Sequence, residues 1–388
     1  MNDLPHPPTA PHRRPIIIVG GGPGGAMTAW TLARTGYEVL LLDAKTFPRP
    51  KPCAGWITRA ALRDMELDET SYPHLLTPIT RVAIGLEEGL QVTQWPEAVS
   101  YGILRRELDD LLLRRAKAAG AEVRLGCRVD RVELCSDEVI IHSGTNSIRG
   151  SLVVGAGGAA CPVARAAEGK SFWKQRTRVG SQMSETHIGH HLLEQSGLGT
   201  GMPVLFPEPE CDGYAWYFTK GDYLNIGVGA LAGGLAIPLR RQRFLERLIR
   251  SGILPSSWKL SPFTGHSYAV WRGLRHPLAG PRHLLIGDAA GLAHDFSGEG
   301  IGPAVQSGLL AAAFIRSGAF RHPSPGSSMD PYTQSLAKLQ GNGLFSAMGG
   351  FLERLPLPVR RSMVHHLCRS PWLRRRLVLE GAFLGKEL

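Results

Sequence analysis

The chain has 388 residues, 43% of them apolar, which is enough for two or three domains, and it has no run of about 18 apolar residues that would span a membrane. Its formal net charge of +11 suggests an acidic partner, and because no motif with interleaved aromatic residues occurs, we rank nucleic acid below a phosphorylated ligand or an anionic membrane surface. The six cysteines form no CxxC pair, which excludes a zinc site or disulfide framework of recognisable spacing and favours a reducing cytoplasm.

The first predicted unit is a strand, a glycine-rich turn, a helix and a second strand over residues 16–43. Four apolar residues indicate a buried parallel strand, and the next glycines have the spacing Gly20-x-Gly22-x-x-Gly25. This spacing allows a tight turn, lets backbone amides approach a pyrophosphate, and lets the helix lie close to the strand. Asp43 ends the second strand, where a carboxylate accepts the hydroxyls of an adenosine ribose. We therefore predict a dinucleotide-binding βαβ unit.

A proline-rich loop follows this unit and carries a cysteine. Three prolines in residues 48–52 forbid a regular helix until about residue 58, so Cys53 lies on a loop together with Trp56. Loops at the carboxyl ends of strands in such a sheet face the ligand crevice. Cys53 is therefore a candidate active-site thiol, and a half-buried loop cysteine without a chemical role is an equally supported alternative.

Antiparallel strands interrupt the nucleotide-binding pattern. A hairpin is predicted inside it, and a β-meander follows the helix that opens near Arg105. Strands then dominate to about residue 281, with one helix near residues 239–251, which indicates a separate substrate domain. The first pattern returns with a short buried strand at residues 284–286, a turn that contains Asp288, and a helix from Gly300 onward. A carboxylate there suits a polyol chain, and a glycine-rich helix N-terminus suits partial negative charge.

These patterns predict an α/β fold that contains a Rossmann-type dinucleotide-binding domain, an inserted, mostly antiparallel β-sheet substrate domain, and a C-terminal helical segment. The N-terminal tail lacks the apolar core of a secretory signal and is expected to be flexible. The expected divisions are the tail at 1–14, the nucleotide domain at 15–165 with a hairpin insertion at 80–96, the substrate domain at 166–281, the return of the nucleotide domain at 282–322, and the C-terminal helical region at 323–388.

The C-terminal segment is basic. Each arginine near an anionic bilayer contributes about 1 kcal/mol, so the segment is a candidate for peripheral contact with the inner face of the membrane. A solvated helix face is the more frequent reason for such charges and stays open. The arginines concerned are Arg354, Arg360, Arg361, Arg369, Arg374, Arg375 and Arg376.

Six motifs in order resemble the geranylgeranyl reductase family of FAD-dependent oxidoreductases. They are GGGPGG, KPCAGW, the helix at Arg105, GAGG, GYAWYF and GDAAG…SGEGIG, and they extend over most of residues 15–320. The family shares its fold with p-hydroxybenzoate hydroxylase and with flavin-dependent monooxygenases and halogenases. The resemblance implies an FAD cofactor, bound in part by Gly20, Gly22, Gly25 and Asp43.

The resemblance also implies roles for individual residues. It places Cys53 near the flavin, Arg105 against the cofactor and Asp288 on the ribityl chain. The remaining family positions fall on Gly298, Glu299, Gly300 and Ile301 beside the isoalloxazine, and on Tyr214, Trp216 and Phe218 in the YxWxFP substrate motif.

Three positions depart from the family pattern. Gly157 stands where many relatives have an Asp that helps to hold the cofactor, which weakens the expectation of direct reduction by NADPH. Thr219 replaces the last proline of the substrate motif. Asp295 replaces a proline beside the flavin and adds a charge to the predicted wall of the active site.

The leading interpretation is a reductase of carbon–carbon double bonds in an isoprenoid lipid, quinone or pigment precursor. Such a site needs a hydride from reduced flavin, a proton donor and an apolar tunnel that orients the chain. Cys53 is the first candidate proton donor and Tyr214 the second. The expected electron donor is NADPH, ferredoxin or a quinol. The residues assigned to the substrate side are Trp56, Trp216, Phe218 and Asp295.

Two other functions stay open at this point. One is a flavin-dependent monooxygenase or halogenase acting on an apolar or aromatic substrate, although the halogenase WxWxIP pattern is absent. The other is an FAD-holding electron-transfer protein without substrate turnover. A metal site is not expected, because the histidines of the THIGHH stretch, which we interpret as a loop, lack a partner at ligand spacing. These histidines are His187, His190 and His191.

Overall fold

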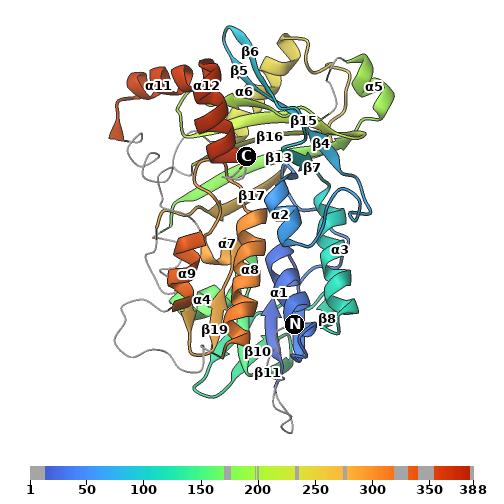
Figure 1. The fold of residues 1–388 in the computed structure, drawn as a ribbon, viewed down its shortest axis with the longest axis vertical. Helices are drawn as coiled ribbons and strands as arrows, with labels where there is room; N and C mark the ends of the chain where they lie inside the picture. The colour runs from blue at the N-terminus through green and yellow to red at the C-terminus, as the bar shows by residue number, and fades with distance from the viewer. Residues whose placement is uncertain are drawn as a thin grey trace.

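Two large β-sheets organise the molecule in the computed structural model (Figure 1). Within the described residues, one sheet has the strand order β18-β19-β12-β1-β2-β8 and the other has the order β17-β13-β16-β15-β14-β5-β6. The predicted tail, except for residue 14, and parts of the predicted C-terminal region lie outside the described residues. The described residues are 14–169, 176–196, 198, 201–231, 236–273, 278–318, 331–339 and 354–384.

The first sheet is parallel except at its edge strand β18. Its central strand β1 pairs in parallel with β12 on one side and with β2 on the other, and all four of its residues are buried. A strand covered on both faces needs a continuous apolar run, which is the pattern of residues 16–19. The strands are β1 (Ile16–Val19), β2 (Val39–Asp43), β8 (Glu122–Leu125), β12 (Leu152–Gly155), β18 (Ala279–Gly280) and β19 (His283–Leu285).

Helices α1 (Pro23–Ala33) and α8 (Ile301–Arg316) pack closely, although they are far apart in the sequence. The Thr28 hydroxyl donates hydrogen bonds to the carbonyl oxygens of Gly24, at 2.8 Å, and of Gly308, at 3.1 Å. A Cβ atom at Gly24 would lie only 2.5 Å from the carbonyl oxygen of Ala304. Small residues therefore permit the close packing of α8, which comes late in the chain, against α1 of the first βαβ unit.

The second sheet is antiparallel except where β14 meets β5. The hairpin predicted at 80–96 forms β5 and β6, and it extends this sheet because Ala83 and Ile84 pair with Val204 and Leu205. The strands are β5 (Arg81–Leu86), β6 (Gly89–Gln94), β13 (Arg178–His187), β14 (Val204–Pro207), β15 (Gly213–Lys220), β16 (Tyr223–Leu231) and β17 (Thr264–Ala269).

Smaller sheets and helices complete the described chain. One three-stranded sheet is the predicted meander, and another lies beside the Cys53 loop. The remaining elements are β3 (Trp56–Thr58), β4 (Thr77–Ile79), β7 (Ser100–Gly102), β9 (Arg131–Leu134), β10 (Val139–Ser143), β11 (Asn146–Gly150), α2 (Arg59–Asp64), α3 (Arg105–Ala118), η1 (Gly158–Ala160), α4 (Pro162–Glu168), α5 (His190–Gln195), α6 (Ile237–Arg250), α7 (Gly287–Ala290) and α9 (Pro331–Leu339).

The interpretation of the THIGHH stretch as a loop is wrong, since α5 begins at His190 and continues the local chain as a helix. His187 lies 3.8 Å from a carboxylate oxygen of Asp222, and His190 pairs with Glu194 one turn along α5. Among the described residues, no group of three or more His, Cys, Asp or Glu side chains is placed to hold a metal ion.

The helices described are also all too short or too polar to cross a membrane.

The C-terminal segment packs against the hairpin through two buried polar side chains. It comprises α11 (Leu357–Arg369), α12 (Pro371–Leu373) and the π-helix η4 (Arg374–Phe383). Arg374 is 5% exposed and donates to the Thr93 hydroxyl at 2.9 Å, the Val92 carbonyl at 3.2 Å and the Cys368 carbonyl at 2.9 Å. Glu380 accepts a hydrogen bond from the Trp95 indole at 3.1 Å. The segment is therefore fixed to the second sheet.

We expect Arg374→Met to loosen this segment, because the Val92 and Cys368 carbonyls would each lose a charged donor. The free energy of unfolding should fall by about 3 kcal/mol. Limited proteolysis should cut within residues 354–384 faster than in the unmodified protein. Arg369→Gln is the matched control, since that side chain is 70% exposed and 3.9 Å from Glu88, and it should change neither measurement. Equal protection of both variants would contradict the role of Arg374.

Candidate active site

A continuous cavity of about 1040 Å³ is lined by residues from both large sheets and from the C-terminal segment. One part, which we call the crevice, is formed by the glycine-rich turns and charged residues of the first sheet. The other part, which we call the chamber, is apolar and aromatic. Crevice residues include Gly20, Gly22, Gly25, Asp43, Arg105, Asp288 and Gly300, and chamber residues include Ile84, Trp56, Leu205, Trp216, Phe296, Val364, Val378 and Phe383.

The crevice begins where β1 ends. Gly20 has φ +116°, and a Cβ atom there would lie 2.3 Å from the Ala156 carbonyl oxygen, so only glycine fits. A Cβ atom at Gly22 would meet nothing within 4 Å, so this backbone faces open space in front of the N-terminus of α1. The Asp43 carboxylate accepts hydrogen bonds from the amides of Gly21, at 2.7 Å, and Lys45, at 2.8 Å. Its position at the end of β2 is thus fixed by the backbone.

Cys53 lines the cavity between the crevice and the chamber. Its sulfur accepts a hydrogen bond from the Gly55 amide at 3.3 Å. The thiol interacts electrostatically with Arg105 on the crevice side and with Tyr214 on the chamber side. The structure therefore brings the predicted thiol, arginine and tyrosine together.

Arg105, the first residue of α3, is a fixed positive charge in the crevice. Its guanidinium makes two hydrogen bonds to the Asp109 carboxylate, at 2.8 and 2.9 Å, one helical turn further along. Burial lowers the pKa of Arg105, but the charge of Asp109 and then the interaction with Cys53 outweigh it, so the pKa is raised. The arginine therefore stays protonated although it is only 8% exposed.

Asp288 belongs to a cluster that joins both sheets. His266 of β17 lies 3.6 Å from its carboxylate, and the Lys51 ammonium lies 2.9 Å from a ring nitrogen of His266. Burial raises the pKa of Asp288, but the His266 hydrogen bond and the Lys51 charge outweigh it, so the carboxylate is kept ionised. Burial, with the nearby Arg105, lowers the pKa of Lys51 to about 8. His266 could not be identified from the sequence, because it comes from a distant strand.

The aromatic residues predicted for the substrate side divide into two groups. Tyr214 and Trp216 line the chamber, and the Trp216 indole donates to the Asn225 side-chain oxygen at 2.9 Å. Phe218 shares their face of β15, as alternation requires, but it is 1% exposed and absent from the cavity wall. Its ring lies next to Trp56, with the two centroids 6.5 Å apart. The expectation that Phe218 lines the chamber is therefore wrong, because its ring is buried in the core of the second sheet.

The Tyr214 hydroxyl donates a hydrogen bond to the Ser297 carbonyl. Burial, followed by the charge of Cys53, raises the pKa of Tyr214. Nearby, Asp295 lines the cavity but forms an ion pair with Arg272 at 3.0 and 3.2 Å. The Asp295 charge that we expected in the wall of the active site is therefore compensated by Arg272.

The turn before α8 holds the remaining predicted residues. Gly298 has φ +67°, and a Cβ atom there would lie 2.4 Å from the Tyr268 hydroxyl oxygen. Gly300 precedes α8 and Ile301 is its first, buried residue. Glu299, between them, lies 3.6 Å from His294, and burial raises the pKa of its carboxyl to about 7.

Phe383 is a chamber residue that the sequence did not indicate. Its ring stacks on Trp56 at a centroid distance of 5.7 Å and an interplanar angle of 23°. It also meets Tyr214 edge-on at 5.4 Å and Phe296 at 6.2 Å. The π-helix that carries it thus closes the chamber with a cluster of aromatic rings, and π-helical segments are frequent at functional sites.

Comparison with known proteins agrees with this arrangement. A family model described as an FAD binding domain matches residues 13–315. The menaquinone reductase of Mycolicibacterium smegmatis is 31% identical over 331 residues, which cover 79% of this chain and 77% of that protein. Digeranylgeranylglycerophospholipid reductase 1 of Methanopyrus kandleri is 28% identical, over 76% of this chain and 78% of that protein.

A solved structure shows the same fold. A geranylgeranyl bacteriochlorophyll reductase-like protein from Thermoplasma acidophilum has a TM-score of 0.75 and 20% sequence identity, covering 97% of this chain and 98% of that one. The expected fold class, a parallel Rossmann-type sheet with an inserted antiparallel sheet and C-terminal helices, is confirmed.

The crevice fits FAD, the cofactor of this fold. The open backbone at Gly22 and the amides at the N-terminus of α1 suit a pyrophosphate, and the fixed carboxylate of Asp43 suits a ribose. We expect Arg105 and Asp288 to contact the cofactor as well, since both are charged and both line the crevice.

The raised pKa of Glu299 predicts a pH-dependent stability. In the unfolded chain this carboxyl has its ordinary pKa of 4.5, so the neutral form favours the fold below pH 4.5, and this contribution is lost as the pH rises to about 7. Over that pH range, the free energy of unfolding of the unmodified protein should fall by up to about 3 kcal/mol relative to that of Glu299→Gln. Urea unfolding at pH 5 and pH 8 measures it. Glu246→Gln, at an exposed position of α6, is the control, and its free energy of unfolding should fall between pH 5 and pH 8 as much as that of the unmodified protein. The same fall in Glu299→Gln would contradict the prediction.

Proposed function

The chain belongs to the FAD-binding domain family and is an FAD-dependent oxidoreductase similar to geranylgeranyl reductases, and from this we propose that it reduces carbon–carbon double bonds of an isoprenoid lipid, quinone or pigment precursor. The names of the two relatives described above denote reductases of menaquinone and of a digeranylgeranyl lipid, and both compounds have isoprenoid chains. We extend this substrate class to the present protein.

The observation that carries the proposal is the continuity of a charged crevice with an apolar chamber, with Cys53 between them. An alkene without polar groups must be held by shape and apolar contact, which the aromatic walls of the chamber supply. We assign the crevice to FAD and the chamber to the substrate. We therefore assign residues 15–165 and 282–322, apart from the hairpin at 80–96, to the cofactor-binding part of the protein. Residues 166–281 and the hairpin are assigned to the substrate-binding part.

Bound FAD supplies the hydride for such a reduction. The protein must then orient the alkene and deliver a proton to its second carbon. We assign the proton to Cys53, because its thiol borders both parts of the cavity. Tyr214 ranks second, since its hydroxyl is engaged by Ser297 and its raised pKa makes it a weaker acid. Trp56 and Trp216 act as chamber walls.

An anaerobic experiment tests this proposal against the two alternatives. The bound flavin is reduced, polyprenyl lipids, quinones and diphosphates are added, and flavin reoxidation is followed together with product mass. Reoxidation with two hydrogens added to the lipid is the expected result. Reoxidation only after oxygen is admitted would overturn it in favour of a monooxygenase or halogenase. Separate assays with NADPH, ferredoxin and a quinol would identify the electron donor.

The Cys53→Ala variant tests the proton donor in the same assay. Its turnover should fall by about 10²-fold or more while FAD stays bound, because general acid catalysis contributes that much. Cys135→Ala is the matched control, since Cys135 is also a partly exposed thiol but does not line the cavity. Unchanged turnover in Cys53→Ala would remove the thiol from the mechanism.

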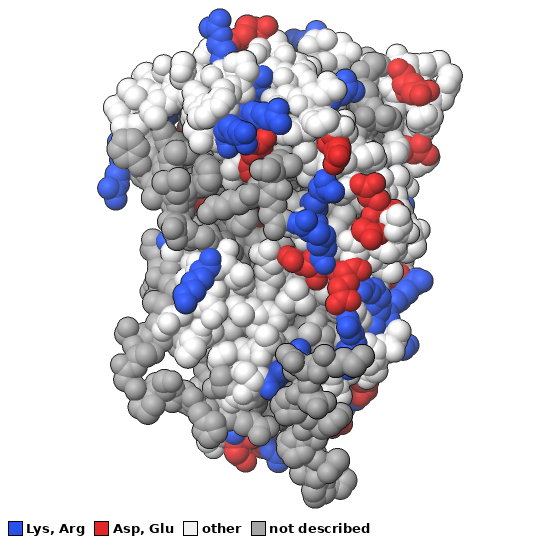
Figure 2. Space-filling model, in the orientation of Figure 1, with Lys and Arg blue, Asp and Glu red and all other residues white. Residues whose placement is uncertain are grey.

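We also propose peripheral contact with an anionic membrane surface, where an isoprenoid substrate would be found. Helix α6 has five arginines and one glutamate, and residues 354–384 have seven arginines and one glutamate. Arg240 and Arg374 are buried, so ten of these twelve arginines are exposed or partly exposed. Figure 1 shows α6, the hairpin tip and α11 at the upper end of the molecule, and blue side chains are visible there in Figure 2.

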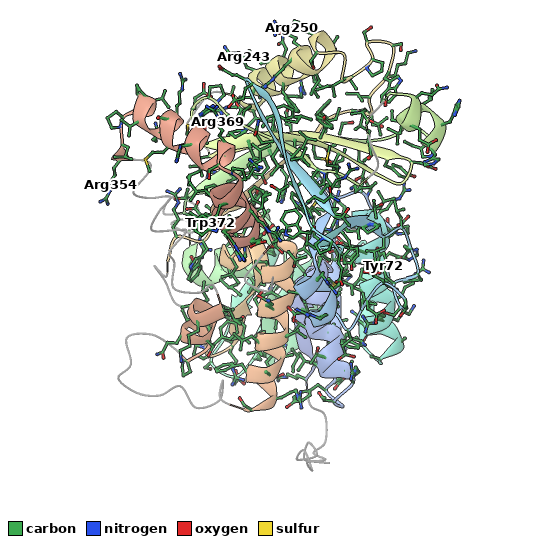
Figure 3. The ribbon with its side chains drawn as sticks, turned by 45° about the horizontal axis from the view of Figure 1, so that its top comes forward. Tyr72, Arg243, Arg250, Arg354, Arg369 and Trp372 are labelled. Atoms are coloured by element: carbon green, nitrogen blue, oxygen red, sulfur yellow. The ribbon has the colours of Figure 1, made fainter. Side chains whose placement is uncertain are left out.

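Exposed apolar side chains lie on the same elements. Trp372 is 66% exposed, Val359 is 45% exposed and Ile249 is 43% exposed. Figure 3 shows Arg369 on the C-terminal helices with Trp372 below it, toward the middle of the view, and Arg243 and Arg250 on α6 at the top. Apolar and cationic groups on one surface are the combination that binds the interface of an anionic bilayer, and tryptophan is enriched at such interfaces.

Sedimentation with vesicles tests the membrane contact. We expect the protein to bind phosphatidylglycerol vesicles more tightly than phosphatidylcholine vesicles, and added salt to weaken the binding. Trp372→Ser should weaken it roughly tenfold, because a large apolar side chain no longer enters the interface. Leu125→Ser is the control, since that exposed residue lies on β8, away from α6 and the C-terminal helices (Figure 1). Equal affinity for both kinds of vesicle would contradict the proposal.

A further inference from the structure

Lys220 is a fully buried charged residue outside the set indicated by the sequence. It ends β15 and has 0% exposure. Its ammonium donates to the carbonyl oxygens of Ala54 and Ile103, each at 2.9 Å, and to the Glu185 carboxylate. An ammonium group has three N–H donors, so these three acceptors satisfy it completely. The lysine thus joins the second sheet to the loop of Cys53.

Gly55 allows this contact. It has φ +69°, and a Cβ atom there would lie 2.5 Å from the Lys220 nitrogen and 2.2 Å from the Ile103 carbonyl oxygen. Only glycine, which has no Cβ atom, lets the Lys220 ammonium approach the Cys53 loop this closely. The glycine of the KPCAGW motif is therefore required by Lys220 as well as by the turn.

The Ala54–Gly55 peptide connects Lys220 to the thiol. Its carbonyl oxygen accepts from Lys220, and its N–H donates to the Cys53 sulfur at 3.3 Å. In a trans peptide these two groups point in opposite directions, so fixing the carbonyl also aims the N–H. A cation at the carbonyl polarises the amide and strengthens the N–H as a donor.

Asn225 holds the preceding peptide. Its side-chain nitrogen donates to the Cys53 carbonyl oxygen at 3.2 Å and to Glu185 at 3.1 Å, while its oxygen accepts from Trp216. Asn225 is also fully buried. Two successive peptide planes after the thiol are therefore held by residues of β15 and β16, and the chamber wall at Trp216 is part of the same network.

We propose that Lys220 is a positioning residue for the Cys53 thiol, acting through the Ala54–Gly55 peptide, and this proposal rests on the proton-donor role given to Cys53 above. When the thiol gives its proton to a substrate carbon, the sulfur left behind is a thiolate. The Gly55 N–H, fixed and polarised by Lys220, stabilises that thiolate.

The test is the pH profile of Cys53 alkylation by iodoacetamide in the FAD-bound protein, read by mass spectrometry of the peptide that contains it. Loss of an oriented donor to a thiolate should slow alkylation of Lys220→Met about tenfold at pH 7 and move the profile to higher pH. Cys135 in the same sample is the internal control. The other titratable groups that act on the thiol are Lys51, Arg105, Tyr214 and Tyr268, and all stay in place.

Two further variants make the result specific. Glu185→Gln leaves both carbonyl contacts of Lys220 intact, so its profile should stay within about twofold of the unmodified protein. Lys117→Met removes an exposed lysine of α3 and should have no effect. If Lys220→Met does not fold, Lys220→Gln, whose uncharged amide keeps two N–H donors, should give a smaller shift in the same direction.

An unchanged profile in Lys220→Met or in Lys220→Gln would overturn the proposal. A shift of equal size but toward lower pH in Glu185→Gln would also overturn it, because the charges of this pair rather than the peptide contact would then be responsible. Turnover is not part of this measurement. A Cys53→Ala variant that still reduces substrate would therefore refute the proton-donor role and leave the alkylation result standing, whereas unchanged alkylation would refute the role of Lys220 alone.

Discussion

The hydrogen bonds of the buried Lys220 ammonium join the second sheet to the Cys53 loop, which lies where the crevice meets the chamber. A charged group without exposure is tolerated only when every donor is satisfied, and here the acceptors come from the Cys53 loop, the segment before α3 and β13. The same contact fixes the Cys53 loop, which borders both the crevice and the chamber. The position of this loop between a cofactor site and a substrate site therefore depends on Lys220 and on the glycine that lets it approach.

Charged groups are compensated in both parts of the cavity. In the crevice, Arg105 and Asp288 remain ionised because each has opposite charges beside it. Toward the chamber, Asp295 is neutralised by Arg272 and the Tyr214 hydroxyl is bound to a carbonyl oxygen. A charged dinucleotide and an apolar chain can thus occupy one continuous space, because the charged groups are paired and most of the chamber wall is apolar or aromatic.

The C-terminal segment closes the chamber and also forms much of the basic surface. Arg374 and Glu380 hold it on the hairpin, so its π-helix can present Phe383 inward while Trp372 stays exposed. In the proposed function, one short segment therefore contacts both the membrane surface and the space that receives the lipid. The sequence predicted that the hairpin belongs to the nucleotide domain. In the structure it is the edge of the second sheet, and the C-terminal segment packs on it.

The sequence alone determined the Rossmann unit, the crevice glycines and the acid at Asp43, because these features depend on local order along the chain and on backbone angles that only glycine adopts freely. It also indicated the strands of the second sheet through their apolar pattern. It could not indicate Lys220, Asn225, His266 or Phe383, and it wrongly put Phe218 on the chamber wall. Those outcomes depend on contacts between segments more than 150 residues apart, such as the 166 residues between Ala54 and Lys220, and only the packing of one sheet against the other decides them.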